Sequence, residues 1–173
     1  FERKVLSDDG DRRIIQDEEG NICEIRTGHS TMPRYIQFGL QTPEDWERLK
    51  HERLDADTEG RIGDLSSEVA RARDAGRPVF FHAGSLYGWL RNWMGLEGLS
   101  VALMTERAWV EEMMDHLTEL TLTMIARALP GIRVDLGWWW EDMCYNGGPL
   151  ISPHMFHEML VPRYRQITQA LHK

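Results

Sequence analysis

Two short apolar runs that flank a long amphipathic helix constrain this fold more than any other feature of the sequence. The runs are 78–84 (PVFFHAG) and 132–140 (IRVDLGWWW), and both are typical of strands buried on both faces. Between them, apolar residues recur every three or four positions, which predicts a helix that begins after Thr105 as its N-cap and ends at Pro130-Gly131. Strands joined by such a crossover pair in parallel. The sequence therefore predicts an α/β fold.

The remaining segments are expected to extend this unit within one domain. Turn sequences near the start indicate a hairpin or a three-stranded excursion, and Thr42-Pro43 is typical of a helix start. The predicted parts are a β-hairpin excursion (1–41), a helical segment (42–76) and βαβα barrel units (77–173). Two strands and a hairpin cannot close a barrel, and natural proteins avoid exposed sheet edges. We therefore expect the chain to be part of a longer protein whose other strands complete the barrel.

Charge and cysteine content narrow the class of protein. The 173 residues include 20 Lys and Arg against 28 Asp and Glu, which gives a formal net charge of −8 and argues against a nucleic-acid binder. No apolar run approaches the ~20 residues that a membrane span needs. Two cysteines, Cys23 and Cys144, are too few for a disulfide framework. These features predict a cytoplasmic protein that acts on a small molecule.

Candidate catalytic residues follow the two predicted strands. His82 ends the first apolar run, and Glu141 and Asp142 come directly after the second. The carboxyl ends of parallel strands meet at one edge of a sheet, so these side chains are predicted to perform acid–base chemistry there. Adjacent acids on a strand point to opposite sides, so at most one enters a pocket. A histidine bonded to backbone, and an Asp142 that merely caps the next loop, are the structural alternatives.

Three further residues are candidates for substrate binding. Trp140 can stack on a flat or cationic substrate, and Tyr145 lies in the glycine-rich loop that follows. Arg91 can hold a carboxylate in fork geometry, although an ion pair with an acid is the commoner use of such an arginine. Trp138 and Trp139 are expected to pack, one against helices and the other in a barrel core.

Evidence for a bound metal or nucleotide is weak in this sequence. His154 and His157 have a spacing that zinc sites sometimes use, but no third ligand lies beside them, and a solvated helix face explains them better. Cys144 can be a reactive thiol, although a buried thiol is more common. The sequence contains no GxGxxG, GxxxxGK[ST], HExxH or CxxC motif. The identity of any metal is left unknown.

Three ordered segments resemble the uroporphyrinogen decarboxylase family, and more narrowly its corrinoid-linked, methyltransferase-like branch. They are 140–143 (WEDM), 148–156 (GPLISPHMF) and 160–164 (LVPRY), supported by weaker matches at 84–88 and 42–46. The resemblance implies a (β/α)8 TIM barrel of about twice this length, with its active site at the carboxyl ends of the strands. The chain would then be a partial barrel with an N-terminal β-hairpin excursion.

The resemblance implies one of two activities. Some members decarboxylate the acetate side chains of uroporphyrinogen in porphyrin biosynthesis without a cofactor. Others move methyl groups between a small donor, a corrinoid on a partner protein and an acceptor, and a zinc site of the thiol methyltransferases would fall beyond Lys173. This chain departs from the decarboxylase pattern at 143–146 and has one extra residue before Pro153.

Composition favours methyl transfer. A carboxylate-rich tetrapyrrole requires a basic cavity, whereas the residues at the predicted strand ends are acidic and rich in tryptophan. An amine or a methoxy-aromatic donor can stack on Trp140 while Glu141 or Asp142 protonates the leaving group. Decarboxylation of uroporphyrinogen and a non-catalytic small-molecule-binding barrel are the alternatives.

Overall fold

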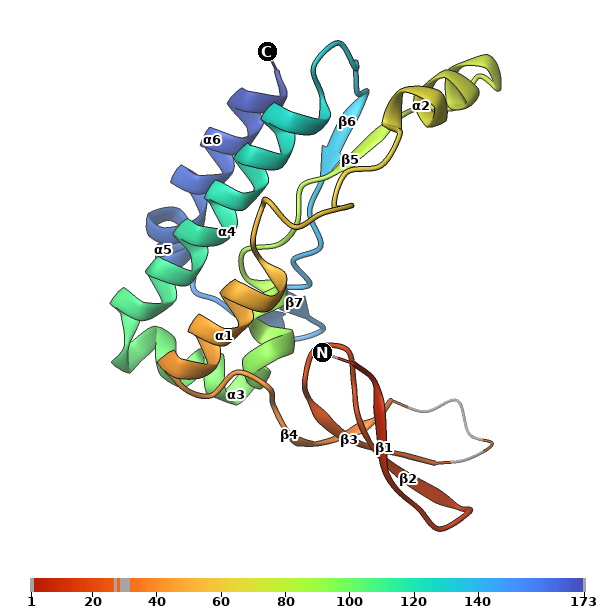
Figure 1. The fold of residues 1–173 in the computed structure, drawn as a ribbon. Coiled ribbons are helices and arrows are strands. Elements are labelled where there is room, and N and C mark those ends of the chain that lie inside the picture. The colour runs from red at the N-terminus through yellow and green to blue at the C-terminus, as the bar shows by residue number, and fades with distance from the viewer. Residues whose placement is uncertain (1, 27, 29–31, 173) are drawn as a thin grey trace.

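The computed structural model describes residues 2–26, 28 and 32–172, and Figure 1 shows them as a small antiparallel sheet attached to a larger mixed α/β body. The elements in chain order are β1 (Lys4–Asp8), β2 (Arg12–Gln16), β3 (Ile22–Arg26), β4 (Arg34–Gln37), α1 (Pro43–Arg53), α2 (Leu65–Asp74), β5 (Phe80–His82), α3 (Gly88–Thr105), α4 (Arg107–Ala128), β6 (Leu136–Trp138), β7 (Cys144–Tyr145), β8 (Gly148–Pro149), α5 (Pro153–Met155), the π-helical turn η1 (Phe156–Leu160) and α6 (Val161–Leu171).

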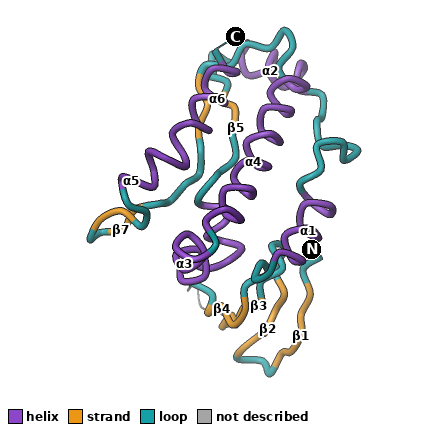
Figure 2. The backbone as a smooth tube through the Cα atoms, turned by 90° about the vertical axis from the view of Figure 1, so that its left-hand side faces the viewer, coloured by secondary structure: helices purple, strands orange, loops and turns teal. Residues whose placement is uncertain are grey.

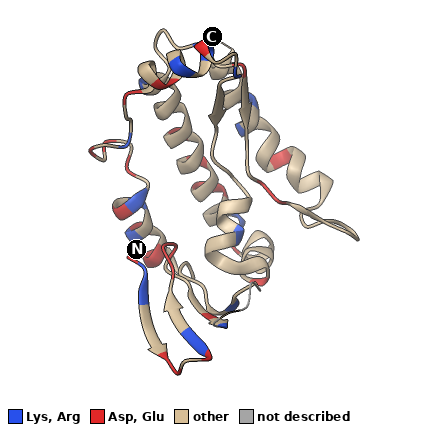
Figure 3. Cartoon of the chain, turned by 90° about the vertical axis from the view of Figure 1, so that its right-hand side faces the viewer, with Lys and Arg blue, Asp and Glu red and all other residues tan. Residues whose placement is uncertain are grey.

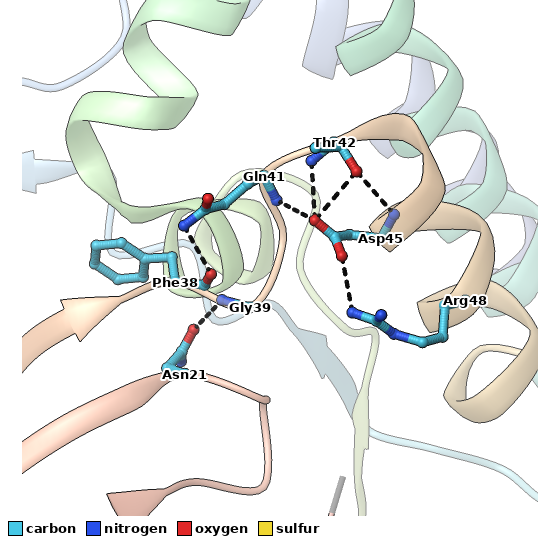
Figure 4. Close-up of polar contacts among 7 residues, drawn as sticks. All are labelled: Asn21, Phe38, Gly39, Gln41, Thr42, Asp45 and Arg48. Carbon is cyan, nitrogen blue, oxygen red and sulfur yellow. Dashed lines mark hydrogen bonds and ion pairs between the residues drawn. The ribbon is translucent and has the colours of Figure 1, made fainter. Parts of the chain in front are cut away.

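The N-terminal excursion is a four-stranded antiparallel sheet in the order β1-β2-β3-β4, one strand more than predicted. It projects from one end of the helical body in both views (Figures 1 and 2). A buried amide, Asn21, joins this sheet to the segment before α1: its Oδ1 accepts a hydrogen bond from Gly39 N at 2.9 Å (Figure 4). A Cβ at Gly39 would lie 2.7 Å from the Glu19 carbonyl oxygen, so only glycine allows this approach.

Helix α1 begins as the sequence predicts. Thr42 is its N-cap, and Thr42 and Asp45 form a capping box in which each side chain accepts from the other's backbone N–H (Figure 4). Asp45 also pairs with Arg48 at 2.8 Å, which orients the first turn. The Leu40 N–H bonds to the Trp93 carbonyl at 3.0 Å, and this contact ties the segment before α1 to α3.

The two apolar runs form the parallel pair β5–β6, with Phe80 opposite Leu136 and His82 opposite Trp138. One face of the pair packs against α4 and α6 through a cluster that includes Ala83, Ile125 and Ile167. The other face is exposed: Phe80 is 54% and Trp138 43% accessible. Burial on both faces, as predicted, is therefore wrong for these strands. Successive side chains along a strand point to opposite faces of the sheet, and here helices cover only one of the two faces.

The crossover between the strands is longer and more complex than predicted. Instead of a short helix at 86–93, α3 continues to Thr105 through a kink at Gly95, whose φ is 77°. A Cβ at Gly95 would lie 2.3 Å from the Phe38 ring, so the kink accommodates the chain that leaves β4. Thr105 is therefore the last residue of α3 and does not cap α4, and its hydroxyl donates to the Val101 carbonyl at 3.0 Å.

Helix α4 runs through the centre of the body, with α6 on one side and α1 on the other in Figure 2. Its buried face carries mainly Val110, Met113, Met114 and Leu117, which join the main core with residues of α1 and α3. Ser152 caps the turn that leads into η1 and α6, as predicted. Among residues 2–26, 28 and 32–172, no helix has both the length and the apolar character that crossing a bilayer requires.

The buried amide of Asn21 should contribute measurably to stability. We expect Asn21→Ala to lower the free energy of unfolding by about 1–3 kcal/mol, because the Gly39 N–H loses its acceptor inside the protein. Urea denaturation followed by circular dichroism measures this change. Asn146→Ala, in an exposed turn, is the matched control and should have little effect. Equal losses in both variants would contradict this role for Asn21.

Candidate functional site

The carboxylate of Glu141 lies at the beginning of α3 and accepts four hydrogen bonds. Oε1 accepts from Leu86 N at 2.8 Å. Oε2 accepts from the other donors, Ser85 Oγ (2.9 Å), Tyr87 N (2.7 Å) and Gly88 N (2.9 Å). Helix α3 has no side-chain cap of its own and no acid in its first turn. Glu141 therefore supplies, from the end of the next strand, the negative charge and acceptors that a helix N-terminus requires.

This geometry gives Glu141 a positioning role at the start of α3. Three of the donors reach Oε2 and one reaches Oε1, so the carboxylate is held by N–H and O–H groups of this chain. The Gly88 position shows how close the two segments lie, because a Cβ there would be 2.4 Å from the Trp140 carbonyl oxygen. Ser85 and Gly88 are the site residues that sequence reasoning missed, and their signal is the GSxxG pattern at 84–88 just after the first strand.

Tyr164 of α6 lies near the same carboxylate. Its ring contacts Trp139 edge-on, with centroids 5.7 Å apart. Trp139 therefore packs against a helix, which is one of the two packing positions predicted for Trp138 and Trp139. Burial, and then the negative charge of Glu141, raise the pKa of the Tyr164 hydroxyl well above its usual value. The tyrosine therefore stays protonated throughout the physiological range and presents a polar but uncharged group.

Asp142 and Arg91 form an ion pair beside Trp140. Arg91 Nη2 lies 2.7 Å from Asp142 Oδ2, and Nη1 donates to the Asp142 carbonyl at 2.9 Å. The guanidinium also lies over the Trp140 ring, 5.6 Å from its centroid. Of the two uses considered for Arg91, the structure contains the ion pair with an acid. The pair holds Asp142 at φ 40°, an uncommon conformation for a residue other than glycine.

His82 lies on the exposed face of the β5–β6 pair. Its Nδ1 accepts a hydrogen bond from Gly84 N at 3.1 Å, so the neutral ring carries its proton on Nε2. The ring meets Trp138 edge-on with centroids 4.2 Å apart and stacks near Trp89 at 6.2 Å. The backbone bond considered for His82 is thus present, and it fixes a ring that remains accessible.

The predicted residues reach one edge of the sheet but do not form a single catalytic cluster. The Ala83 N–H bonds to the Trp138 carbonyl, and the Trp140 N–H to the Gly84 carbonyl, which brings the two strand ends together. Within the described residues, His82 has no hydrogen bond or ion pair to Glu141 or Asp142. Trp140 is 38% and Tyr145, in the β7–β8 hairpin, 64% exposed.

No zinc site is present in the described part of the chain, where no three His, Cys, Asp or Glu residues cluster as metal ligands. His154 Nε2 instead lies 3.3 Å from Glu158, and His157 is exposed, as expected for a solvated helix face. Cys144 is exposed, which differs from the buried thiol thought more common. The residues available at the strand ends are therefore aromatic rings, an imidazole and a paired acid.

Comparison with known proteins adds no relative: neither a family model, nor a curated protein, nor a solved structure matches this chain.

Replacing Glu141 tests its positioning role. Glu141→Gln should lower the free energy of unfolding by about 2–4 kcal/mol, because the amide NH2 faces a backbone donor and the negative charge at the helix start is lost. Chemical denaturation measures the change. Asp142→Asn is the matched control, since the Asp142 side chain is 53% exposed and its ion pair should contribute less than about 1 kcal/mol. Equal stability of wild type and Glu141→Gln would contradict the assignment.

Proposed function

We propose that this chain is part of a (β/α)8 barrel related to the uroporphyrinogen decarboxylase family, and that it transfers a methyl group from a small methylated donor to a corrinoid protein or a related acceptor. The observation that carries the proposal is the parallel β5–β6 pair with helices on one face only. In such barrels the helices lie outside and the opposite strand face lines the interior. A two-stranded sheet alone is marginal, so further strands are expected beside β5 and β6.

The uncovered face has the character of a small-molecule site. Neither strand carries Lys, Arg, Asp or Glu (Figure 3), and the exposed side chains near the carboxyl ends are His82 and Trp138. Because Arg91 already lies over the Trp140 ring, Trp138 is the better platform for an amine or a methoxy-aromatic donor. Aromatic rings with a few polar groups are the usual lining of ligand pockets.

His82 is the group best placed to assist the reaction. When the bond from the donor's heteroatom to its methyl carbon breaks, the heteroatom keeps the electron pair and needs a proton unless it already carries positive charge. His82 can supply that proton from its imidazolium form, which arises when Nδ1 releases the Gly84 N–H and takes up a proton from solvent; the accessible ring then returns to neutral as Nε2 gives its proton to the heteroatom. Asp142 is engaged by Arg91 and Glu141 by α3, so neither is as suitable a donor.

Two observations bear on the alternatives. Arg91 is neutralised by Asp142, which leaves this mouth poorly suited to a carboxylate-rich tetrapyrrole and disfavours decarboxylation of uroporphyrinogen. Both candidate acids are engaged in structural contacts, which favours the non-catalytic binding barrel as the second candidate.

The proposal is tested by following demethylation of dimethylamine and of a methoxybenzoate by mass spectrometry, in the intact protein with a reduced corrinoid as acceptor. We expect turnover of one donor class. For a donor that needs the proton, the demethylation rate of His82→Gln should be about 10²–10⁴-fold lower, which is the usual contribution of general acid–base catalysis. His51→Gln, an exposed histidine of α1, is the control and should retain full rate.

Other results would contradict methyl transfer. Donor binding without turnover would support the binding barrel, and carbon dioxide release from uroporphyrinogen would support the decarboxylase. An unchanged rate in His82→Gln would remove His82 from the reaction.

A further inference from the structure

A cavity of about 250 Å³ lies between the β2–β3 turn, α1 and α3. It is lined by Glu19, Leu49, Arg53, Leu54, Trp89 and Trp93. The parallel strands β5 and β6 contribute nothing to this lining, so the cavity is distinct from the exposed strand face described above. Its size is below the range of about 300–1,000 Å³ typical of drug-sized ligands, which points to a small molecule.

Two indole rings form one wall of this cavity. The Trp89 and Trp93 centroids are 5.9 Å apart with their planes inclined by 33°, and Leu49 and Leu54 supply buried apolar surface beside them. Indole faces attract cations, and alkylated ammonium groups in particular, because the ring carries negative charge on its faces. The wall therefore suits a positively charged group that is poorly hydrated.

Opposite charges border the same cavity. Glu19 is held in its turn by Asp17, whose Oδ1 accepts from the Glu19 N–H at 2.9 Å. Burial, and then the charge of Asp17, raise the pKa of the Glu19 carboxyl, although Arg53 and the amide of Asn21, whose Nδ2 lies 3.5 Å from Glu19 Oε2, favour its charged form. Arg53, the last residue of α1, is anchored by a hydrogen bond to the Glu18 carbonyl. A guanidinium has five N–H donors and can meet a carboxylate in addition to this contact.

We propose that this cavity binds a small zwitterion, with an alkylated ammonium group against Trp89, Trp93 and Glu19 and a carboxylate against Arg53. A simple cation would be repelled by Arg53, and a simple anion by Glu19. A neutral apolar ligand would displace water from both side chains and offer neither of them an opposite charge in exchange. A ligand that carries both charges places an opposite charge beside each of the two side chains as well as a cation against the indole rings. The proposal is independent of methyl transfer and of the barrel.

Three probes of similar shape separate these possibilities by isothermal titration calorimetry on the unmodified protein. Glycine betaine carries both charges, choline lacks the carboxylate, and tert-butylacetate lacks the positive charge. We expect glycine betaine to bind at least about tenfold more tightly than either of the others, because each probe that lacks a charge loses one ion pair. Quenching or enhancement of tryptophan fluorescence should accompany its binding.

Variants assign the two charges. Glu19→Gln and Arg53→Gln should each weaken glycine betaine binding about tenfold. Glu59→Gln and Arg71→Gln, which remove the same charges at exposed positions outside the cavity, should bind as wild type does. No heat with glycine betaine, choline binding as tightly as betaine, or an unchanged affinity in Glu19→Gln would each overturn the proposal. The probe comparison needs no variant, so it holds even if Arg53→Gln fails to fold.

Discussion

The hydrogen bonds from the start of α3 to the Glu141 carboxylate are the contacts on which the arrangement of the strand ends depends. The N-cap residue of α3 makes no side-chain cap, and the Gly88 N–H and the two amides before it donate to an acid more than fifty residues later in the chain, while the Trp89 N–H donates to Ser85 Oγ. Free N–H groups at a helix start are costly when they are buried, and they attract negative charge. One side chain therefore fixes the end of β6 against the segment that follows β5.

The neighbouring contacts follow from this connection. Once Glu141 is turned towards α3, the next residue, Asp142, meets Arg91 from the second turn of the same helix. Arg91 in turn covers Trp140, so the acid pair and the nearest tryptophan become parts of the scaffold. His82 and Trp138 are exposed at this edge and take no part in these contacts, so the proposed chemistry moves to them. The zwitterion cavity uses the other side of α3, where Trp93 faces the N-terminal sheet and α1.

The sequence predicts which strands and helices pair with one another better than it predicts the role of each residue. Alternating strand and helix patterns indicate the parallel β5–β6 pair, and Thr42-Pro43 and Ser152-Pro153 mark helix starts, because these signals are local. The role of Glu141 is not local: an acid after a strand looks the same whether it donates protons or caps a distant helix. The length of α3 is missed because Gly95 resembles a helix end, whereas here Phe38 packs where its side chain would be.

Hydrogen exchange at the backbone N–H groups of Leu86, Tyr87 and Gly88 tests the central claim most directly. These amides lie at the first residue of α3 and at the two positions before it, where N–H groups without an acceptor would exchange almost as fast as in an unfolded chain. The account predicts that they are protected in the wild-type protein and lose protection in Glu141→Gln, while amides in the middle of α4 keep theirs. Rapid exchange at all three positions in the wild type would contradict it.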